Sequence, residues 1–265
     1  MRSNGTTPER HALTVIARIH SDFSEKFGIP RQSGLVEGLR ARIVFEPEFR
    51  DPEAVRGLEE FSHIWLIWQF SQAVREGWSP TVRPPRLGGN KRLGVFATRS
   101  PFRPNALGLS AVRLEGIEQD SGLGPVLLVA GADLLDGTPI YDIKPYVPYA
   151  DAHPEASGGF ADRIERRRLT VDFPPHLLER VPEDKREGLT GVLAQDPRPA
   201  YQADPERVYG MAFAGLEVRF TVEGVRLTVQ DVNPAGNADA TAKTAKISFC
   251  MYRKAPSSKR QRQEK

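Results

Sequence analysis

Short apolar segments that end at proline, glycine or charged residues follow one another from residue 13 to residue 148. The clearest spans residues 39–47, where Leu39, Ala41, Ile43 and Phe45 fall on one face, as in a half-buried strand. Six or seven short strands with only one or two short helices favour a mainly β barrel or sandwich over alternating βαβ units. The strands are predicted at residues 13–21, 39–47, 63–71, 93–98, 109–117, 126–130 and 138–148.

Three features refine this pattern. A short helix is predicted at 51–61, with Asp51 as the N-cap and proline at the first helical position. The apolar run "HIWLIWQF" predicts a buried strand, and His63 is interpreted as a packed core histidine. Because proline cannot donate to a neighbouring strand, Pro145 and Pro148 predict that the strand at 138–148 lies at an edge.

The chain changes character after residue 150. Residues 151–163 read as a linker, and a small α+β domain follows. Its predicted elements are a strand at 167–173, a helix at 182–195, a hairpin at 216–232 that turns at Glu223-Gly224, and a last strand at 245–253. We therefore expect a first domain at 10–155, a second at 165–254 and a basic, disordered tail at 255–265.

Composition excludes several classes of protein. The one cysteine, Cys250, rules out an intrachain disulfide and is interpreted as a small buried residue. The five histidines show no ligand spacing, so no metal site is predicted. Apolar runs are too short to span a membrane and no signal peptide is recognisable, which predicts a soluble, cytoplasmic protein. The net charge of +3 permits a polyanionic partner without requiring one.

Four polar clusters stand at predicted strand ends, in residues 25–34, 99–105, 133–146 and 196–201. In each, prolines fix the backbone around an arginine or an aspartate, which lowers the entropy lost when that group is held in place. They are either binding loops or ordinary turns. The chain has no G-x-G-x-x-G and no P-loop motif, so a nucleotide-like cofactor would bind without Rossmann geometry.

Together the segments "EKFGIPRQ", "FEPEFRDPEAVRGLEEFSHIWLIW", "TRSPFRPNALGLS", "DLLDGTPIYDIKPY" and "DPRPAY" resemble the TsaA-like family, from about Leu13 to the last predicted strand. The resemblance implies an S-adenosylmethionine-dependent methyltransferase with an N-terminal β-barrel cofactor domain. A smaller C-terminal domain would help to bind tRNA. The implied reaction methylates N6 of threonylcarbamoyladenosine at position 37, in the anticodon loop, and the family forms homodimers.

The resemblance also implies roles for particular residues. At the end of the tryptophan-containing strand the family often has His-Gln, whereas this chain has Ser71 and Gln72. The serine departs from that pattern, so of these two residues Gln72 is the better-supported cofactor contact. For the tRNA it implies Asp196, Arg198 and Tyr201. For the cofactor it implies Pro30, Arg31, Gln32, Ser71, Gln72, Arg99, Leu109, Asp133, Leu134, Leu135 and Asp136.

Some roles stay open at this level. The general base could be a protein carboxylate or the substrate's own carboxylate, so no catalytic residue is assigned. Arg103 and Asn105 could serve the cofactor, the tRNA or the loop alone. Two other functions compete: a non-catalytic RNA- or nucleotide-binding barrel, and a related methyltransferase with another substrate. The Ser71 departure is the only feature that supports the first of these, and the motif "DPRPAY", which a relative with the barrel alone would lack, argues against the second.

Overall fold

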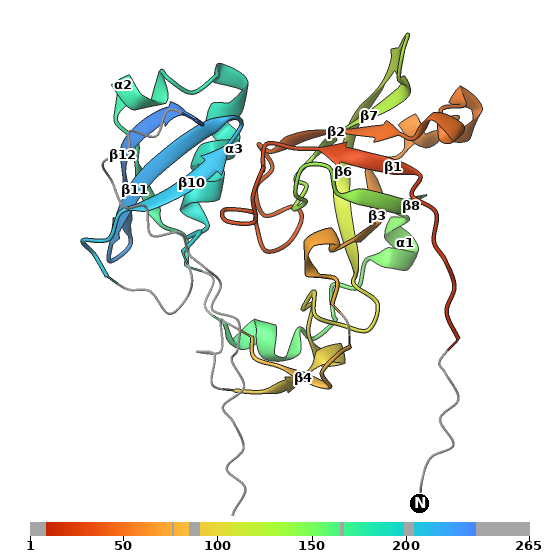
Figure 1. The fold of residues 1–265 in the computed structure, drawn as a ribbon, viewed down its shortest axis with the longest axis horizontal. Coiled ribbons are helices and arrows are strands. Elements are labelled where there is room, and N and C mark those ends of the chain that lie inside the picture. Colours follow the sequence, from red (N-terminus) through yellow and green to blue (C-terminus); the bar gives the residue numbers. More distant parts are fainter. Residues whose placement is uncertain (1–8, 76, 85–90, 165–166, 199–203, 237–265) are drawn as a thin grey trace, which may run out of the picture. The chain divides into compact units, whose positions relative to one another are not determined.

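The computed structural model describes residues 9–75, 77–84, 91–164, 167–198 and 204–236, and the chain up to Ala235 forms one compact unit. Six strands pair in the order β1-β2-β7-β6-β3-β8, and β8 pairs again with β1, so the sheet is closed (Figure 1). Every pairing in it is antiparallel. The prediction of a mainly β chain is confirmed. The strands are β1 (Ala17–His20), β2 (Arg40–Phe45), β3 (His63–Gln69), β6 (Leu107–Asp120), β7 (Gly124–Ala130) and β8 (Pro139–Pro145).

The closed sheet encloses its own hydrophobic core. Ala41, Ile43 and Phe45 all face inward from β2, and Leu39 just before it is also buried, as the alternation predicts. In the pairing of β1 with β2, Ala17 lies opposite Phe45 and Ile19 opposite Ile43. On β3, Ile64, Leu66 and Trp68 point into the same core.

A second sheet follows, in the order β10-β11-β12-β9, with β9 parallel to β12. The helix predicted at 182–195 and the hairpin turning at Glu223-Gly224 are both confirmed, whereas β10 and α2 are too short to show a clear periodicity. Helix α3 covers one face of this sheet (Figure 1). The elements are β9 (Thr170–Asp172), α2 (Pro175–Leu178), α3 (Glu183–Ala194), β10 (Tyr209–Phe213), β11 (Leu216–Glu223) and β12 (Arg226–Pro234).

The loop between β1 and β2 contributes to the core of this second sheet. Phe23, Val36 and Leu39 are buried together with residues of α3 and β10–β12. Lys185 Nζ on α3 lies 2.9 Å from Asp22 Oδ1 at the start of the loop. Burial raises the pKa of Asp22, and the hydrogen bond from Lys185 opposes that rise. This packing and this ion pair fix the loop that carries the first polar cluster.

Short elements connect the strands. Strands β4 (Thr81–Val82) and β5 (Leu93–Gly94) form a separate two-stranded sheet. The strand predicted at 93–98 is wrong beyond Gly94, because the chain turns there into a 3-10 helix, Val95–Ala97. Among the described residues, the other 3-10 helices are Pro47–Phe49, Pro52–Val55, Leu58–Glu60, Ser71–Ala73 and Gly159–Arg163, and α1 spans Pro148–Asp151.

Three local predictions are corrected by the structure. His63 is exposed, because it begins β3 on the outward face. Strand β8 is not an edge strand: it pairs with both β1 and β3, and its prolines stand at its two ends, where they interrupt no ladder. The helix at 51–61 is two 3-10 turns, although Asp51 does cap the first by accepting a hydrogen bond from the amide of Glu53 at 2.9 Å.

The strand predicted at 245–253, Cys250 and the basic tail lie outside the described residues. No helix in the described part of the chain is both long and apolar enough to cross a membrane.

Candidate active site

The loop that carries "TRSPFRPN" is held by its own hydrogen bonds. The hydroxyl of Thr98 donates to the carbonyl of Val95 at 2.9 Å, and the amide of Phe102 donates to Ser100 Oγ at 3.2 Å. Arg103 Nη1 donates to the carbonyl of Thr98 at 2.9 Å. Of the roles left open for Arg103, the structure supports the one within the loop.

Arg99 reaches from this loop to the loop between β1 and β2. Its Nη1 donates a hydrogen bond to Gln32 Oε1, and Gln32 Nε2 in turn donates to the carbonyl of Arg31. Two residues predicted to bind the cofactor, distant in sequence, are therefore in direct contact. Pro30, immediately before Arg31, is buried and anchors this part of the loop.

Asp133 lies at the end of a buried hydrogen-bond chain. Trp68 Nε1 on β3 donates to Ser110 Oγ on β6 at 3.0 Å, and Ser110 Oγ donates to Asp133 Oδ1 at 2.7 Å. Burial raises the pKa of the Asp133 carboxyl, while the hydrogen bond from Ser110 and the charge of Arg99 pull that pKa back. Asp133, Arg99 and Gln32 thus belong to one electrostatic cluster built from three loops.

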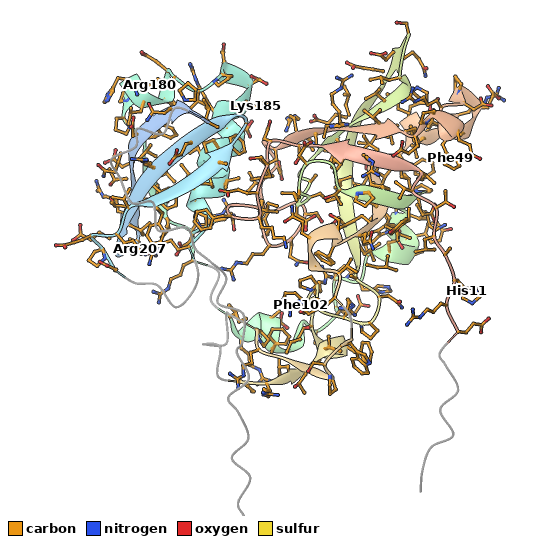
Figure 2. The ribbon with its side chains drawn as sticks, viewed as in Figure 1. His11, Phe49, Phe102, Arg180, Lys185 and Arg207 are labelled. Atoms are coloured by element: carbon orange, nitrogen blue, oxygen red, sulfur yellow. The ribbon has the colours of Figure 1, made fainter. Side chains whose placement is uncertain are left out.

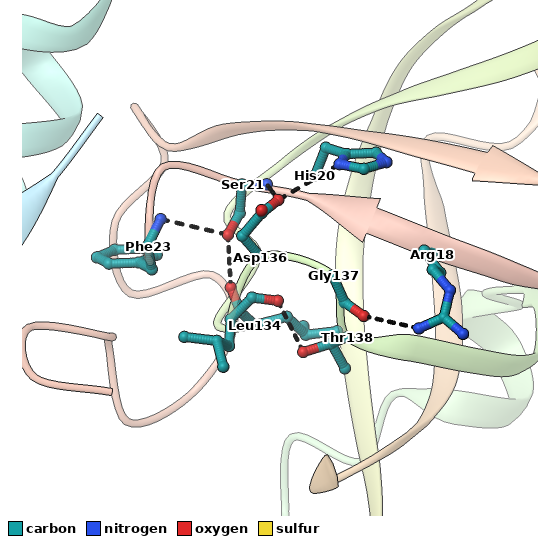
Figure 3. Close-up of polar contacts among 9 residues, drawn as sticks. Arg18, His20, Ser21, Phe23, Leu134, Asp136, Gly137 and Thr138 are labelled. Carbon is teal, nitrogen blue, oxygen red and sulfur yellow. Dashed lines mark hydrogen bonds and ion pairs between the residues drawn. The ribbon is translucent and has the colours of Figure 1, made fainter. Parts of the chain in front are cut away.

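The four residues of "DLLD" face different surroundings. Leu134 is buried in the core of the closed sheet, and Leu135 packs against the core of the second sheet. Asp136 turns to the end of β1, where its Oδ1 accepts from the amide of Ser21 at 3.1 Å and lies 3.4 Å from His20 Nδ1 (Figure 3). Ser21 Oγ also donates to the carbonyl of Leu134 at 2.8 Å. Of these four side chains, only Asp133 joins the cluster around Arg99.

The remaining predicted cofactor residues lie on the neighbouring strands. Ser71 and Gln72 are exposed on the turn after β3, and the carbonyl of Gln72 accepts a hydrogen bond from Lys26 Nζ at 3.1 Å. Leu109 stands on β6 opposite Ile67 of β3, with 56% of its surface exposed. A leucine this exposed on a strand offers an apolar surface to a ligand, on the face of β6 opposite to that of Ser110.

The motif "DPRPAY" is described only in part. Arg198 makes a bidentate pair with Asp196, from Nε to Oδ1 at 2.8 Å and from Nη2 to Oδ2 at 2.9 Å, and its side chain is only 12% exposed. Asp196 itself takes the left-handed backbone conformation, with a φ of 53°. Tyr201 lies outside the described residues. The pair therefore fixes the turn from Asp196 to Arg198.

Two of the cavities among the described residues differ in whether predicted site residues line them. One of about 40 Å³ is lined by Pro30, Arg31 and the end of α3, and it has room for about one water molecule. The other, of about 640 Å³, lies among the 3-10 turns after β2 and includes none of the predicted site residues. Within the described ranges, no group of three or more His, Cys, Asp or Glu side chains is placed to hold a metal ion. The polar cluster, rather than either cavity, defines the candidate site.

Sequence reasoning missed four residues of this region: Ser110, Trp68, Lys26 and Phe102. Ser110 carried a signal, because a serine on the inward face of a strand must find a hydrogen-bond partner. Lys26 and Phe102 stood inside recognised clusters, but only folding reveals what they contact.

Comparisons with known proteins agree along most of the chain. Residues 18–152 match the tRNA-methyltransferase O N-terminal domain, and residues 166–235 match the TrmO C-terminal domain. The tRNA (adenine(37)-N6)-methyltransferase of Escherichia coli is 42% identical over 229 residues, which cover 83% of this chain and 96% of the relative. A Pseudomonas aeruginosa protein named as an S-adenosylmethionine-dependent methyltransferase is 45% identical, over 79% of this chain and 92% of the relative.

The fold agrees as well. A crystal structure of TrmO from P. aeruginosa superposes with a TM-score of 0.71 at 38% identity, over 87% of this chain and 100% of that one. With both domains matched in order and a relative covered almost end to end, the chain belongs to the tRNA-methyltransferase O (TrmO) family.

Proposed function

We propose that this protein transfers a methyl group from S-adenosylmethionine to N6 of the adenosine at position 37 of tRNA, with threonylcarbamoyladenosine as the substrate nucleoside. The observation that carries the proposal is the cluster of Arg99, Gln32 and Asp133, which three separate loops bring together. The relatives' names support the reaction and the cofactor.

The chemistry of this cluster fits S-adenosylmethionine. A cofactor with a carboxylate, an ammonium group, ribose hydroxyls and a purine needs a cation, an acid, neutral polar groups and an apolar surface. Arg99 supplies the cation, Asp133 the acid, Gln32 and Gln72 the neutral groups, and the exposed Leu109 the apolar surface. We infer that the closed six-stranded sheet is the cofactor-binding barrel.

The bound cofactor supplies an electrophilic methyl group on a sulfonium. The chain's own contribution is positioning and electrostatics, because the transfer requires the reacting atoms to be held in line. Asp133 offers a negative charge in a partly buried place, and its hydrogen bond to Ser110 holds the carboxylate in one orientation. Arg99 and Gln32 hold each other, which lowers the entropy lost on binding.

We further propose the division of labour between the parts of the chain. Residues 10–155 bind the cofactor, and residues 165–254 contact the tRNA through the turn of Asp196 and Arg198, with Tyr201 stacking on a base of the single-stranded anticodon loop. In this arrangement Arg198 positions the turn through Asp196. The protein works as a homodimer in the cytoplasm, where its tRNA substrate is found.

One experiment tests the function directly. The full chain is incubated with methyl-labelled S-adenosylmethionine and with tRNA that carries or lacks threonylcarbamoyl at adenosine 37. Label on the modified tRNA alone supports the proposal. Binding of the cofactor without transfer to either tRNA would support a non-catalytic binding protein, and equal transfer to both would show that the threonylcarbamoyl group is not recognised.

A variant separates the two proposed regions. Arg198→Ala should raise the KM for tRNA while the affinity for the cofactor stays unchanged, because the pair with Asp196 lies on the motif assigned to the tRNA. A loss of cofactor affinity, measured by calorimetry, would place the motif at the cofactor site instead.

A further inference from the structure

Lys26 and Arg75 lie together at the edge of the candidate cofactor site. Lys26 Nζ donates to the carbonyl of Gln72 at 3.1 Å, three residues before Arg75. The positive charge of Arg75 acts on Lys26: burial first, and then this charge, lowers the pKa of the lysine. The two cations come from different loops and lie close enough for the charge of one to act on the other.

The guanidinium of Arg75 is held in place by an aromatic ring. Its Cζ lies 3.8 Å from the centre of the Phe102 ring, in the loop that also carries Arg99. Figure 2 labels Phe102 on that loop. Stacking occupies the flat face of a guanidinium but leaves its N–H groups along the edge available to an acceptor. Arg75 is thus oriented before any ligand arrives.

In the part of the chain that the structure describes, Lys26 and Arg75 have no acidic partner. Among the described residues, no carboxylate forms an ion pair with either, whereas Lys185, Arg198 and Arg40 are each paired with an acid. Glu25, next to Lys26 in sequence, is turned away, because its Oε1 accepts from the amide of Ala212 at 3.3 Å. Two uncompensated like charges repel each other, so an anion between them removes a cost that the free protein bears.

We propose that Lys26 and Arg75 form an anion-binding pair that receives an oxyanion of the RNA substrate beside the bound cofactor. This proposal rests on the proposed function and adds to it the residues that contact the substrate. The oxyanion is either the carboxylate of the threonylcarbamoyl group or a phosphate of the anticodon loop. Both offer charged oxygens to N–H donors, and they differ in whether the modification is needed.

The test uses the full chain and two anticodon stem-loop RNAs, one with threonylcarbamoyladenosine and one with adenosine at position 37. The variant Lys26→Gln/Arg75→Gln removes the two charges. The control variant Lys144→Gln/Arg56→Gln likewise removes one lysine charge and one arginine charge. Both positions are exposed and paired with an acid, Asp142 or Glu53, and none of these four residues is a predicted site residue. RNA affinity is measured by fluorescence anisotropy over a range of salt concentrations, and cofactor affinity by calorimetry.

The Lys26→Gln/Arg75→Gln variant should bind RNA about 10-fold more weakly or worse, with unchanged cofactor affinity. If phosphate is bound, both RNAs weaken alike and the slope of log affinity against log salt falls by about 2. If the carboxylate is bound, only the modified RNA weakens. Either result supports RNA binding by Lys26 and Arg75. The variant Lys26→Arg/Arg75→Lys, which keeps both positive charges, should retain most of the RNA affinity of the unmutated chain.

Other results overturn the proposal. RNA affinity equal to that of the control variant would show that the pair binds no RNA oxyanion. A loss confined to cofactor affinity would assign the pair to the cofactor's own carboxylate. If the unmutated chain methylates RNA and only the proposal fails, the proposed function stands; if the unmutated chain neither binds nor methylates either RNA, both fail.

Discussion

Replacing Ser110 by alanine tests the hydrogen-bond chain that supports Asp133. Ser110 is 2% exposed, and its hydroxyl accepts from Trp68 Nε1 at 3.0 Å and donates to Asp133 Oδ1 at 2.7 Å. Ser110→Ala removes a hydrogen bond to a carboxylate and leaves the indole N–H buried without a partner. Each loss costs about 1–3 kcal/mol, so we expect the free energy of unfolding to fall by about 2–6 kcal/mol at neutral pH.

The loss of unfolding free energy caused by Ser110→Ala should increase with pH. Burial already raises the pKa of Asp133 above 3.8, and the Ser110 hydrogen bond lowers it, so Ser110→Ala raises the folded-state pKa further. Below the unfolded-state pKa the carboxyl is protonated in both states, and this contribution vanishes. As pH rises, the unfolded state loses its proton first, which favours unfolding. The difference between variant and parent should therefore grow as the pH rises above the folded-state pKa of Asp133 in the parent, and level off above that of the variant.

The assay is urea unfolding followed by tryptophan fluorescence, combined with a double-mutant cycle. Trp68→Phe removes the donor that Ser110→Ala leaves unpaired, so the double variant should lose about 1 kcal/mol less than the sum of the two single variants. Ser62→Ala, at an exposed hydroxyl 3.0 Å from His63 Nδ1, is the control and should change stability by less than about 0.5 kcal/mol. Additive losses in the cycle, or a cost for Ser110→Ala that does not change with pH, would refute the reasoning.

Three further outcomes follow from the same structure. Arg99→Ala should weaken S-adenosylmethionine binding by about 10-fold in calorimetry, because a charge-assisted contact is lost; unchanged affinity would remove Arg99 from the site. Lys185→Ala should lower the free energy of unfolding by about 2 kcal/mol at neutral pH, because it leaves the carboxylate of Asp22, which is 12% exposed, without its partner. Because the folded-state pKa of Asp22 is already raised, this loss of stability should shrink toward pH 4. A loss that does not change with pH would contradict the ion pair. Gly28→Ala should cost about 1–3 kcal/mol, because its φ is +93° and the new Cβ would collide with the Met211 side chain; a melting temperature equal to the parent's would refute that packing.

Periodicity alone identified the elements with a clear pattern. The inward face of β2 follows from the alternation of Ala41, Ile43 and Phe45, and α3 follows from a helical stretch that stops before Asp196-Pro197. Predictions from local sequence rules failed where contacts between distant segments decided the structure. Pro145 and Pro148 argued for an edge, yet β8 pairs with both β1 and β3, because Pro145 is its last residue and Pro148 lies beyond it, at the start of α1.

The candidate site shows the same division. The sequence by itself determined which loops are stiff and charged, since proline and glycine act locally, and the resemblance named the ligand. It could not determine which groups meet. Arg99 contacts Gln32, which is 67 positions away in the sequence. Asp133 accepts a hydrogen bond from Ser110, whereas Asp136 of the same motif accepts one from the amide of Ser21. Only the tertiary structure decided these pairings, because hydrogen bonds and charges act over a few ångströms in space and sequence distance does not fix that separation.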